Sequence, residues 1–271
     1  EIVVLGKTGA GKSSLANTIF GTSLFKIDDS PNSGTSECKA ETRCVNGRNL
    51  MWIDTPGFFD TDRPEEELKP EIVKCITECT PGPHVFLIVL KVEKYTEQEK
   101  NIINKLQQCF SEEALTYAIV LFTHGDQLPE GKKIEQWVDL NTDLRDLMKK
   151  CGRRFHHDEY RSNQFQVAEL LKTIDKMVEA NKGSCYTNEM LQAVEEEIQQ
   201  EEKLIKESNA NKSGEEIRAE AKSNVQKRLF IAVSATAVSA TRRCQAQLPA
   251  LPCQRCQNRE VRVSYLKYRH G

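Results

Sequence analysis

The sequence predicts an α/β fold in which a mostly parallel sheet carries helices on both faces and is followed by a C-terminal helical extension. Residues 85–92 and 117–122 are apolar at almost every position, as expected for parallel strands that are buried on both faces. Over roughly the first 180 residues, amphipathic stretches separate the apolar runs, and this alternation is typical of strands joined by helices.

The first elements are two short strands, each followed by a helix. Residues 2–5 are entirely apolar, and a glycine-rich turn separates them from a helix that includes residues 15–20. A second, mostly apolar run at 49–53 ends directly before Asp54, so an acidic side chain follows this predicted strand. Residues 70–79 have a pattern that favours a helix.

The central strand at 85–92 is followed by a helix over residues 96–110. Thr96 and Glu99 have the spacing of a capping box, in which each side chain binds a backbone N–H of the other residue, and this pattern marks the helix start. The remaining elements of this region are a strand at 117–122 and amphipathic helices at 134–149 and 167–180.

The composition changes after residue 182. Residues 189–228 are rich in Glu, Lys and Gln with a narrow apolar stripe, and a break at 208–214 divides them into two helical pieces. A solvated helix, a packing arm and a coiled coil all fit this pattern. The predicted organisation is a domain at 1–182, a helical extension at 183–230 and a disordered basic tail at 231–271.

Composition and charge argue against several functional classes. The 38 Lys and Arg nearly balance the 40 Asp and Glu, so a formal net charge of −2 predicts no specific nucleic-acid binding. No run of 18 apolar residues predicts a transmembrane helix. The ten cysteines are scattered, which favours reduced thiols in a cytoplasmic protein. Since residue 1 already lies in a predicted strand, we expect the natural chain to begin upstream.

The strongest local pattern is GKTGAGKS at residues 6–13, which matches G-x-x-x-x-G-K-[ST] and lies between a predicted strand and a predicted helix. Its glycines let backbone N–H groups converge on a phosphate. Lys12 supplies a cation for the β- and γ-phosphates, and the hydroxyl of Ser13 suits Mg²⁺. The predicted phosphate site comprises Gly6, Lys7, Thr8, Gly9, Ala10, Gly11, Lys12, Ser13 and Ser14.

Two further patterns bear on the choice of nucleotide. Asp54 opens a D-x-x-G sequence, in which the carboxylate can hold Mg²⁺ through water and the N–H of Gly57 can approach the γ-phosphate. Thr123, His124 and Asp126 follow the strand that ends at residue 122. A carboxylate at 126 can accept hydrogen bonds from N1–H and N2–H₂ of guanine, a donor pair that adenine lacks. The ring of His124 can stack on the base, where most guanine-binding loops carry a Lys.

Together, the stretches GKTGAGKSSLANTIFG, DTPGFFDT, PGPHVFLIVLKVEKYTEQEK and FTHGD resemble the AIG1-type GTPases, the GTPases of immunity-associated proteins, which are related to septins and chloroplast import GTPases. The resemblance covers residues 1–180. It implies a P-loop NTPase G domain that binds GTP or GDP with Mg²⁺ and hydrolyses GTP. It also implies two mobile loops, with switch I at about 28–38 and switch II beginning at 54–57.

The resemblance assigns roles to individual residues. Lys12, Thr35 and Gly57 would form the catalytic group, while Ser13, Thr35 and Asp54 would hold Mg²⁺. It further implies that GTP orders both loops and pairs two G domains through the switch face, giving a homodimer or larger oligomer. Because members of the family often act on intracellular membranes, the expected location is cytoplasmic, with peripheral association with such membranes.

Three departures from the family pattern affect the predicted activity. Phe58 follows Gly57 where other GTPases carry a Gln that orients the attacking water, so hydrolysis should be slow. Lys94 stands where some members carry an Arg that acts in trans, and a Lys lacks the planar fork. The stretch after His156 lacks the expected Asn pair at the guanine. Three functions therefore stay open: a slow GTPase switch, a GTP-gated assembly scaffold with negligible catalysis, and a nucleotide-free protein that retains only the fold.

Overall fold

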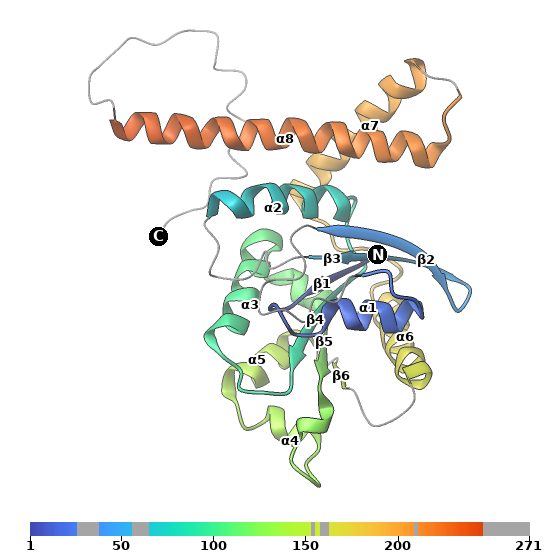
Figure 1. The fold of residues 1–271 in the computed structure, drawn as a ribbon, viewed down its shortest axis with the longest axis vertical. Coiled ribbons are helices and arrows are strands. Elements are labelled where there is room, and N and C mark those ends of the chain that lie inside the picture. Colours follow the sequence, from blue (N-terminus) through green and yellow to red (C-terminus); the bar gives the residue numbers. More distant parts are fainter. Residues whose placement is uncertain (26–37, 56–64, 153–154, 158–162, 209–210, 246–271) are drawn as a thin grey trace. The chain divides into compact units, whose positions relative to one another are not determined.

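A computed structural model of the chain describes residues 1–25, 38–55, 65–152, 155–157, 163–208 and 211–245 (Figure 1). The chain divides into two compact units, the first comprising Glu1–Leu191 and the second beginning at Gln192. The predicted nucleotide-site residues that the structure describes all belong to the first unit.

The first unit is built on a six-stranded sheet with the strand order β2-β3-β1-β4-β5-β6. Neighbouring strands run parallel except for β2, which pairs antiparallel with β3, so the predicted mostly parallel sheet is confirmed. In the register of the central strands, Ile2 lies opposite both Trp52 and Val85. The strands are β1 (Ile2–Leu5), β2 (Lys39–Val45), β3 (Arg48–Asp54), β4 (Val85–Lys91), β5 (Ala118–Thr123) and β6 (Phe155–His157).

Helices cover both faces of this sheet, as the alternating pattern predicts (Figure 1). On one face, α1 and α6 contribute Ile19 and Leu170 to a core cluster that also contains Leu87 of β4. On the other face, the ring of Phe110 in α3 lies 5.2 Å from the ring of Phe86. The helices are α1 (Lys12–Phe20), α2 (Glu65–Cys79), α3 (Glu97–Phe110), α4 (Ile134–Val138), α5 (Thr142–Lys150) and α6 (Asn163–Ala180), with 3₁₀ helices at Glu112–Tyr117 and Gly125–Gln127.

The edge strands β2 and β6 are absent from the sequence prediction. Most side chains of β2 are exposed, so the strand lacks the apolar run by which buried strands are recognised. The turn that joins β2 to β3 does carry a signal. Asn46 and Gly47 both adopt positive φ angles, of 51° and 78°, as a two-residue hairpin turn requires. Strand β6 has three residues, too few for a periodic pattern.

The predicted single helix over residues 134–149 is wrong, because the structure has two helices there. Helix α4 ends at Val138 and α5 begins at Thr142. Between them, the side chain of Asn141 accepts a hydrogen bond from the backbone N–H of Leu144 at 3.0 Å. Asn is a favoured N-cap, and this interaction starts a new helix inside an otherwise continuous amphipathic stretch.

The first unit runs past residue 182 because Tyr186 packs into its core. This side chain is almost fully buried, with its ring 5.6 Å from that of Phe86 and 5.7 Å from that of Tyr117. Its hydroxyl lies 3.1 Å from Oγ of Ser111. The backbone here also meets Gly82, where a Cβ would lie 1.7 Å from the carbonyl oxygen of Tyr186, so a larger residue at 82 would displace the segment.

The second unit contains most of α7 (Glu189–Ser208) and α8 (Gly214–Gln245), which are joined by ion pairs. Arg218 of α8 binds Glu195 at 2.6 Å and Glu202 at 3.1 Å in α7. These contacts pair the two helices with each other and do not show a coiled coil. Helix α8 continues past the predicted boundary at 230 to residue 245. Among the described helices, none is both long and apolar enough to cross a membrane.

We expect Tyr186→Ala to destabilise the first unit by about 3–5 kcal/mol, since it removes a large buried ring from a cluster of aromatic side chains. Tyr186→Phe should cost only about 0.5–1.5 kcal/mol, because it keeps the ring and removes only the hydroxyl, which contacts Oγ of Ser111 and accepts a hydrogen bond from Nδ2 of Asn188. Urea denaturation followed by tryptophan fluorescence measures both changes.

The matched control is Leu140→Ala, since Leu140 is 70% exposed and its truncation should change the unfolding free energy by about 0.5 kcal/mol at most. If Tyr186→Ala proves as mild as this control, residues 183–191 do not belong to the core of the first unit.

Candidate functional site

The phosphate loop connects β1 to α1, and two of its glycines are required by its path. Gly6 passes so close to β4 that a Cβ would lie 2.5 Å from the carbonyl oxygen of Val89. Gly11 has a φ of 92°, a left-handed conformation that other residues rarely adopt, and it is the N-cap of α1. Helix α1 begins at Lys12, so its free N–H groups and positive dipole end lie at the loop, which suits an anion.

Lys12 is buried within this loop, with 8% of its surface exposed. Its Nζ donates hydrogen bonds to the carbonyl oxygens of Gly6 at 2.7 Å and Lys7 at 3.0 Å. These are neutral acceptors, and a phosphate oxygen forms a stronger charge-assisted bond with an ammonium group. Lys12 is therefore held where an incoming phosphate can take over its hydrogen bonds.

Ser13 and Asp54 meet at the edge of the sheet although 41 positions separate them in the chain. The hydroxyl of Ser13 donates to Oδ2 of Asp54 at 3.2 Å. Asp54 is fully buried, and its Oδ1 has no hydrogen-bond partner among the described residues. Burial raises the pKa of Asp54, while the nearby Lys12 ammonium and the Ser13 hydrogen bond oppose this increase.

These oxygen donors fit Mg²⁺. A hard divalent cation prefers carboxylate and hydroxyl oxygens, and the unpartnered Oδ1 of Asp54 is a buried acceptor that needs a cation or a donor. Within the described ranges no cluster of three His, Cys, Asp or Glu side chains could hold a metal by itself. Because Mg²⁺ prefers an octahedral shell of oxygens, a cation beside Ser13 and Asp54 would take its other ligands from outside this pair, such as phosphates and water.

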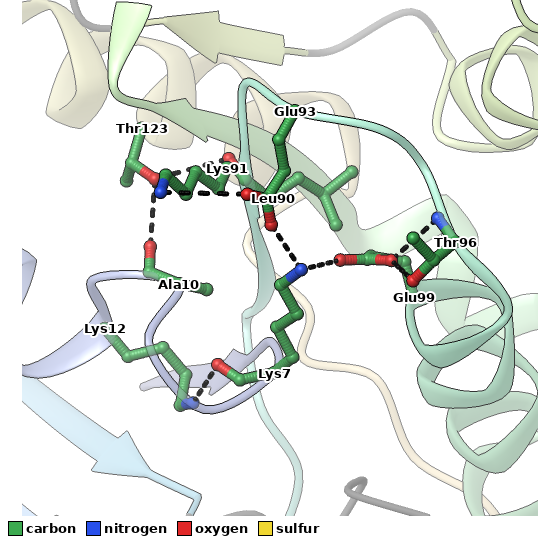
Figure 2. Close-up of polar contacts among 9 residues, drawn as sticks. All are labelled: Lys7, Ala10, Lys12, Leu90, Lys91, Glu93, Thr96, Glu99 and Thr123. Carbon is green, nitrogen blue, oxygen red and sulfur yellow. Dashed lines mark hydrogen bonds and ion pairs between the residues drawn. The ribbon is translucent and has the colours of Figure 1, made fainter. Parts of the chain in front are cut away.

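The end of β5 is bound to the phosphate loop through Thr123, the last residue of the strand. Its hydroxyl donates to the carbonyl oxygen of Ala10 at 2.9 Å and lies 3.4 Å from that of Leu90 (Figure 2). His124 follows with a φ of 57°, which turns the chain sharply before the 3₁₀ helix that contains Asp126. The tie through Thr123 therefore sets the position of the two polar side chains predicted to contact the base.

A cavity of about 320 Å³ opens beside these residues. It brings together Thr123, His124 and Asp126 with Gly11 and Ser14 of the phosphate site, as the two predicted parts of one nucleotide site require. Sequence reasoning missed the remaining lining residues, which belong to α1, β5 and α6 and have no motif that marks them. They are Leu15, Thr18, Ile19, Leu121, Gln166, Val167 and Leu170.

Lys7 has a role that the phosphate-loop motif does not reveal. Its side chain extends away from Lys12 and reaches the carboxylates of Glu93 and Glu99, which belong to the segment after β4 (Figure 2). Thr8 and Gly9 lie at the exposed tip of the same loop. The predicted contribution of Lys7 to phosphate binding can therefore come from its backbone while the ammonium group serves another contact.

Several predicted residues lie outside the described part of the chain. They include Thr35 and Gly57 of the catalytic and metal sets, Phe58, and residues 158–160 after the expected guanine-side run. Lys94 is described and is exposed on the segment between β4 and α3. The described site therefore comprises the phosphate loop, Asp54 and the base-side cavity.

The amino-acid sequence that forms this site matches a known protein family. The AIG1 family matches residues 1–206. Immune-associated nucleotide-binding protein 8 of Arabidopsis thaliana is 34% identical over 230 residues, which cover 80% of this chain and 64% of that protein. GTPase IMAP family member 8 of Mus musculus is 32% identical over 185 residues, which cover 65% of this chain and 27% of that protein. The chain thus spans less than two thirds of the length of both relatives.

Solved structures share the fold at lower identity. Toc33 from Arabidopsis thaliana, in complex with GDP and Mg²⁺, has a TM-score of 0.51 and 18% identity, covering 65% of this chain and 82% of that one. A second similar structure concerns the chloroplast translocon components atToc33 and psToc159. Dimerization of these proteins is described as important for their GTPase activity. This second structure has a TM-score of 0.51 and 19% identity, covering 65% of this chain and 81% of that one. This chain belongs to the AIG1 family, and its first unit has the P-loop G-domain fold.

Proposed function

We propose that the first unit binds GTP and GDP with Mg²⁺ and hydrolyses GTP slowly. One observation carries this proposal: Lys12, the Ser13–Asp54 pair and the cavity beside Asp126 all lie where β1, β3 and β5 end. Ligands of open parallel sheets bind at this carboxyl edge. Family membership supports the proposal, since the relatives carry the names nucleotide-binding protein and GTPase.

Each of the described side chains would bind a different part of the nucleotide. Lys12 would leave the carbonyl oxygens of Gly6 and Lys7 to bind the β- and γ-phosphates, while the N–H groups of the loop surround the phosphate chain. Asp126 would accept the two guanine donors, and the exposed ring of His124 would lie against the base. Apolar side chains of α1 and α6 line the rest of the cavity.

Ser13 and Asp54 would hold Mg²⁺, together with Thr35 as the family resemblance implies. When bound, Mg²⁺ neutralises the charge that develops on the transferred phosphoryl group. The contribution of this chain is the orientation of the two oxygens: Ser13 is fixed at the start of α1, and Asp54 at the end of β3.

We propose slow hydrolysis because Phe58 stands where a water-orienting Gln is common, and its side chain has no group that can hold a water molecule. GTP would order the loops that contain Thr35 and Gly57, and the ordered face would pair with a second copy of the G domain. The dimerization described for atToc33 and psToc159 supports this part of the proposal by analogy.

A scaffold with negligible catalysis is the second candidate. Lys94 is exposed, so it can reach a partner, but its single ammonium group cannot form the two parallel hydrogen bonds of a guanidinium group with a phosphate. In this alternative, GTP drives assembly and little turnover follows.

We expect Asp126→Asn to lower the affinity for GTP by about 10- to 100-fold, since one charge-assisted hydrogen-bond pair to guanine is lost. Affinity for xanthosine triphosphate should rise, because its O2 acceptor pairs with the amide N–H₂ that Asn offers. Calorimetry with GTP and with xanthosine triphosphate measures both changes in affinity. Glu130→Gln, which removes an exposed charge from the same loop, is the control and should change neither affinity. An unaltered GTP affinity in Asp126→Asn would exclude this carboxylate from base recognition.

We expect Asp54→Asn to abolish most of the gain in GTP affinity that Mg²⁺ provides, a loss of about 10- to 100-fold. Only the charged carboxylate holds a cation well, and burial raises the pKa of Asp54. The Mg²⁺-dependent gain should therefore disappear as the pH falls through that raised pKa, starting at a higher pH than for an exposed Asp. Titrations with and without Mg²⁺ across pH measure this, with the exposed Asp139→Asn as control. A gain that Asp54→Asn leaves intact would place the cation elsewhere.

We expect the GTPase rate per chain to rise with chain concentration, because a second G domain completes the site. Lys94→Arg should raise this rate further at high concentration by restoring the planar fork, whereas Lys132→Arg, on an exposed loop, should not. Single-turnover assays and sedimentation with a non-hydrolysable GTP analogue measure rate and assembly together. Assembly with negligible turnover at every concentration would favour the scaffold over the GTPase.

A further inference from the structure

Lys7 lies between the phosphate loop and the segment that leads from β4 into α3, and it contacts both. Its carbonyl oxygen accepts a hydrogen bond from Nζ of Lys12 at 3.0 Å. Its own Nζ pairs with Glu93 and lies 2.7 Å from Oε1 of Glu99 (Figure 2). One residue therefore links the cation of the phosphate site to two carboxylates outside it.

The two carboxylate oxygens of Glu99 bind different partners: one pairs with Lys7 and the other binds Thr96 at the start of α3. Oε1 binds Lys7, while Oε2 accepts hydrogen bonds from the backbone N–H of Thr96 at 2.8 Å and from the Thr96 hydroxyl. The residue is 3% exposed. Burial alone would raise the pKa of Glu99, but the contacts with Lys7 and Thr96 outweigh it and lower the pKa. Glu99 is therefore a charged group at neutral pH, and the start of α3 depends on it.

The segment between these carboxylates is held at both ends by the same ammonium group. We call residues 93–99 the 93–99 segment. Glu93 binds Lys7 at its first position and Glu99 binds Lys7 at its last. Lys94 lies between them and is exposed, and Tyr95 is half-buried. Lys94 therefore lies between two residues that both pair with Lys7.

Lys7 is poorly suited to bind phosphate with its own ammonium group. The side chain extends away from Lys12, and both carboxylates would have to be abandoned for it to turn back (Figure 2). Hydrogen bonds to Glu93 and Glu99 raise its pKa, although burial opposes this increase. Its position in the loop and its paired charge instead suit a residue that transmits movement of the loop.

We propose that Lys7 is a positioning residue that couples nucleotide occupancy of the phosphate loop to the conformation of the 93–99 segment. This inference rests on the proposed nucleotide function. A phosphate that draws Nζ of Lys12 away from the Lys7 carbonyl changes the hydrogen bonding at Lys7, and the ion pairs pass this change to both ends of the segment. Coupling is reciprocal, so a partner that binds the segment at Lys94 alters nucleotide affinity by the same factor.

The test is hydrogen exchange of the 93–99 segment in the full chain, measured by mass spectrometry with and without Mg²⁺ and a non-hydrolysable GTP analogue. Glu99→Gln is the informative variant, since Gln retains the capping interaction with Thr96 and loses the charge that pairs with Lys7. Glu97→Gln is the matched control. It removes a charge from the same first turn of α3, but Glu97 is exposed and pairs with Lys100.

In the natural sequence and in Glu97→Gln, the nucleotide should slow exchange in the segment by about fivefold or more. In Glu99→Gln, this nucleotide-dependent difference should fall below about twofold, although the analogue still binds. A purely structural role would speed exchange in Glu99→Gln equally with and without nucleotide and preserve the difference. A preserved difference overturns the proposal.

Two further measurements keep the outcomes distinct. Calorimetry on the natural sequence separates the two proposals: absence of guanine-nucleotide binding contradicts the proposed function, whereas binding without any protection of the segment contradicts only the coupling. Glu93→Gln tests the second ion pair at a more exposed site, with 34% of its side chain accessible, and so serves if Glu99→Gln does not fold. It should reduce the protection, and full protection in this variant would contradict the coupling.

Discussion

The close approach of the phosphate loop to the ends of β4 and β5 is the constraint on which the site depends. Gly6 lies against the carbonyl oxygen of Val89, where no side chain fits, and the hydroxyl of Thr123 binds the carbonyl oxygen of Ala10. These contacts join the ends of β4 and β5 to the loop that follows β1. The loop therefore acquires its shape from the sheet, and the positive end of α1 is directed to the point where phosphates would collect.

Buried charged side chains determine which ligands the carboxyl edge of the sheet can bind. Lys12, Asp54 and Glu99 are buried, and each lies beside groups that offset the loss of water. The balance at Asp54 is incomplete, because burial raises its pKa and one oxygen has no described hydrogen-bond partner. Such a group is costly in an isolated domain and favours binding of a cation. The buried carboxylate of Asp54 thus both costs stability in the isolated domain and supports the proposed binding of Mg²⁺.

The sequence predicted the parts of the fold that have a strong local pattern. The buried central strands and the phosphate loop are examples, since each depends on residues that are neighbours in the chain. The edge strand β2 and the break at Asn141 depend on pairing and on a single capping bond, which apolar periodicity does not record. The base-side cavity and the ion pairs of Lys7 join residues far apart in sequence, so only the fold could bring Gln166 and Asp126 to one cavity or Lys7 beside Glu99.

The most direct measurement is the identity and amount of nucleotide released when the purified chain is denatured, with the natural sequence and Lys12→Ala compared by chromatography. We expect close to one guanine nucleotide per chain in the natural sequence, little adenine nucleotide, and a large loss of guanine nucleotide in Lys12→Ala. Equal occupancy in the two proteins, or adenine in the place of guanine, would contradict a GTP site at this phosphate loop.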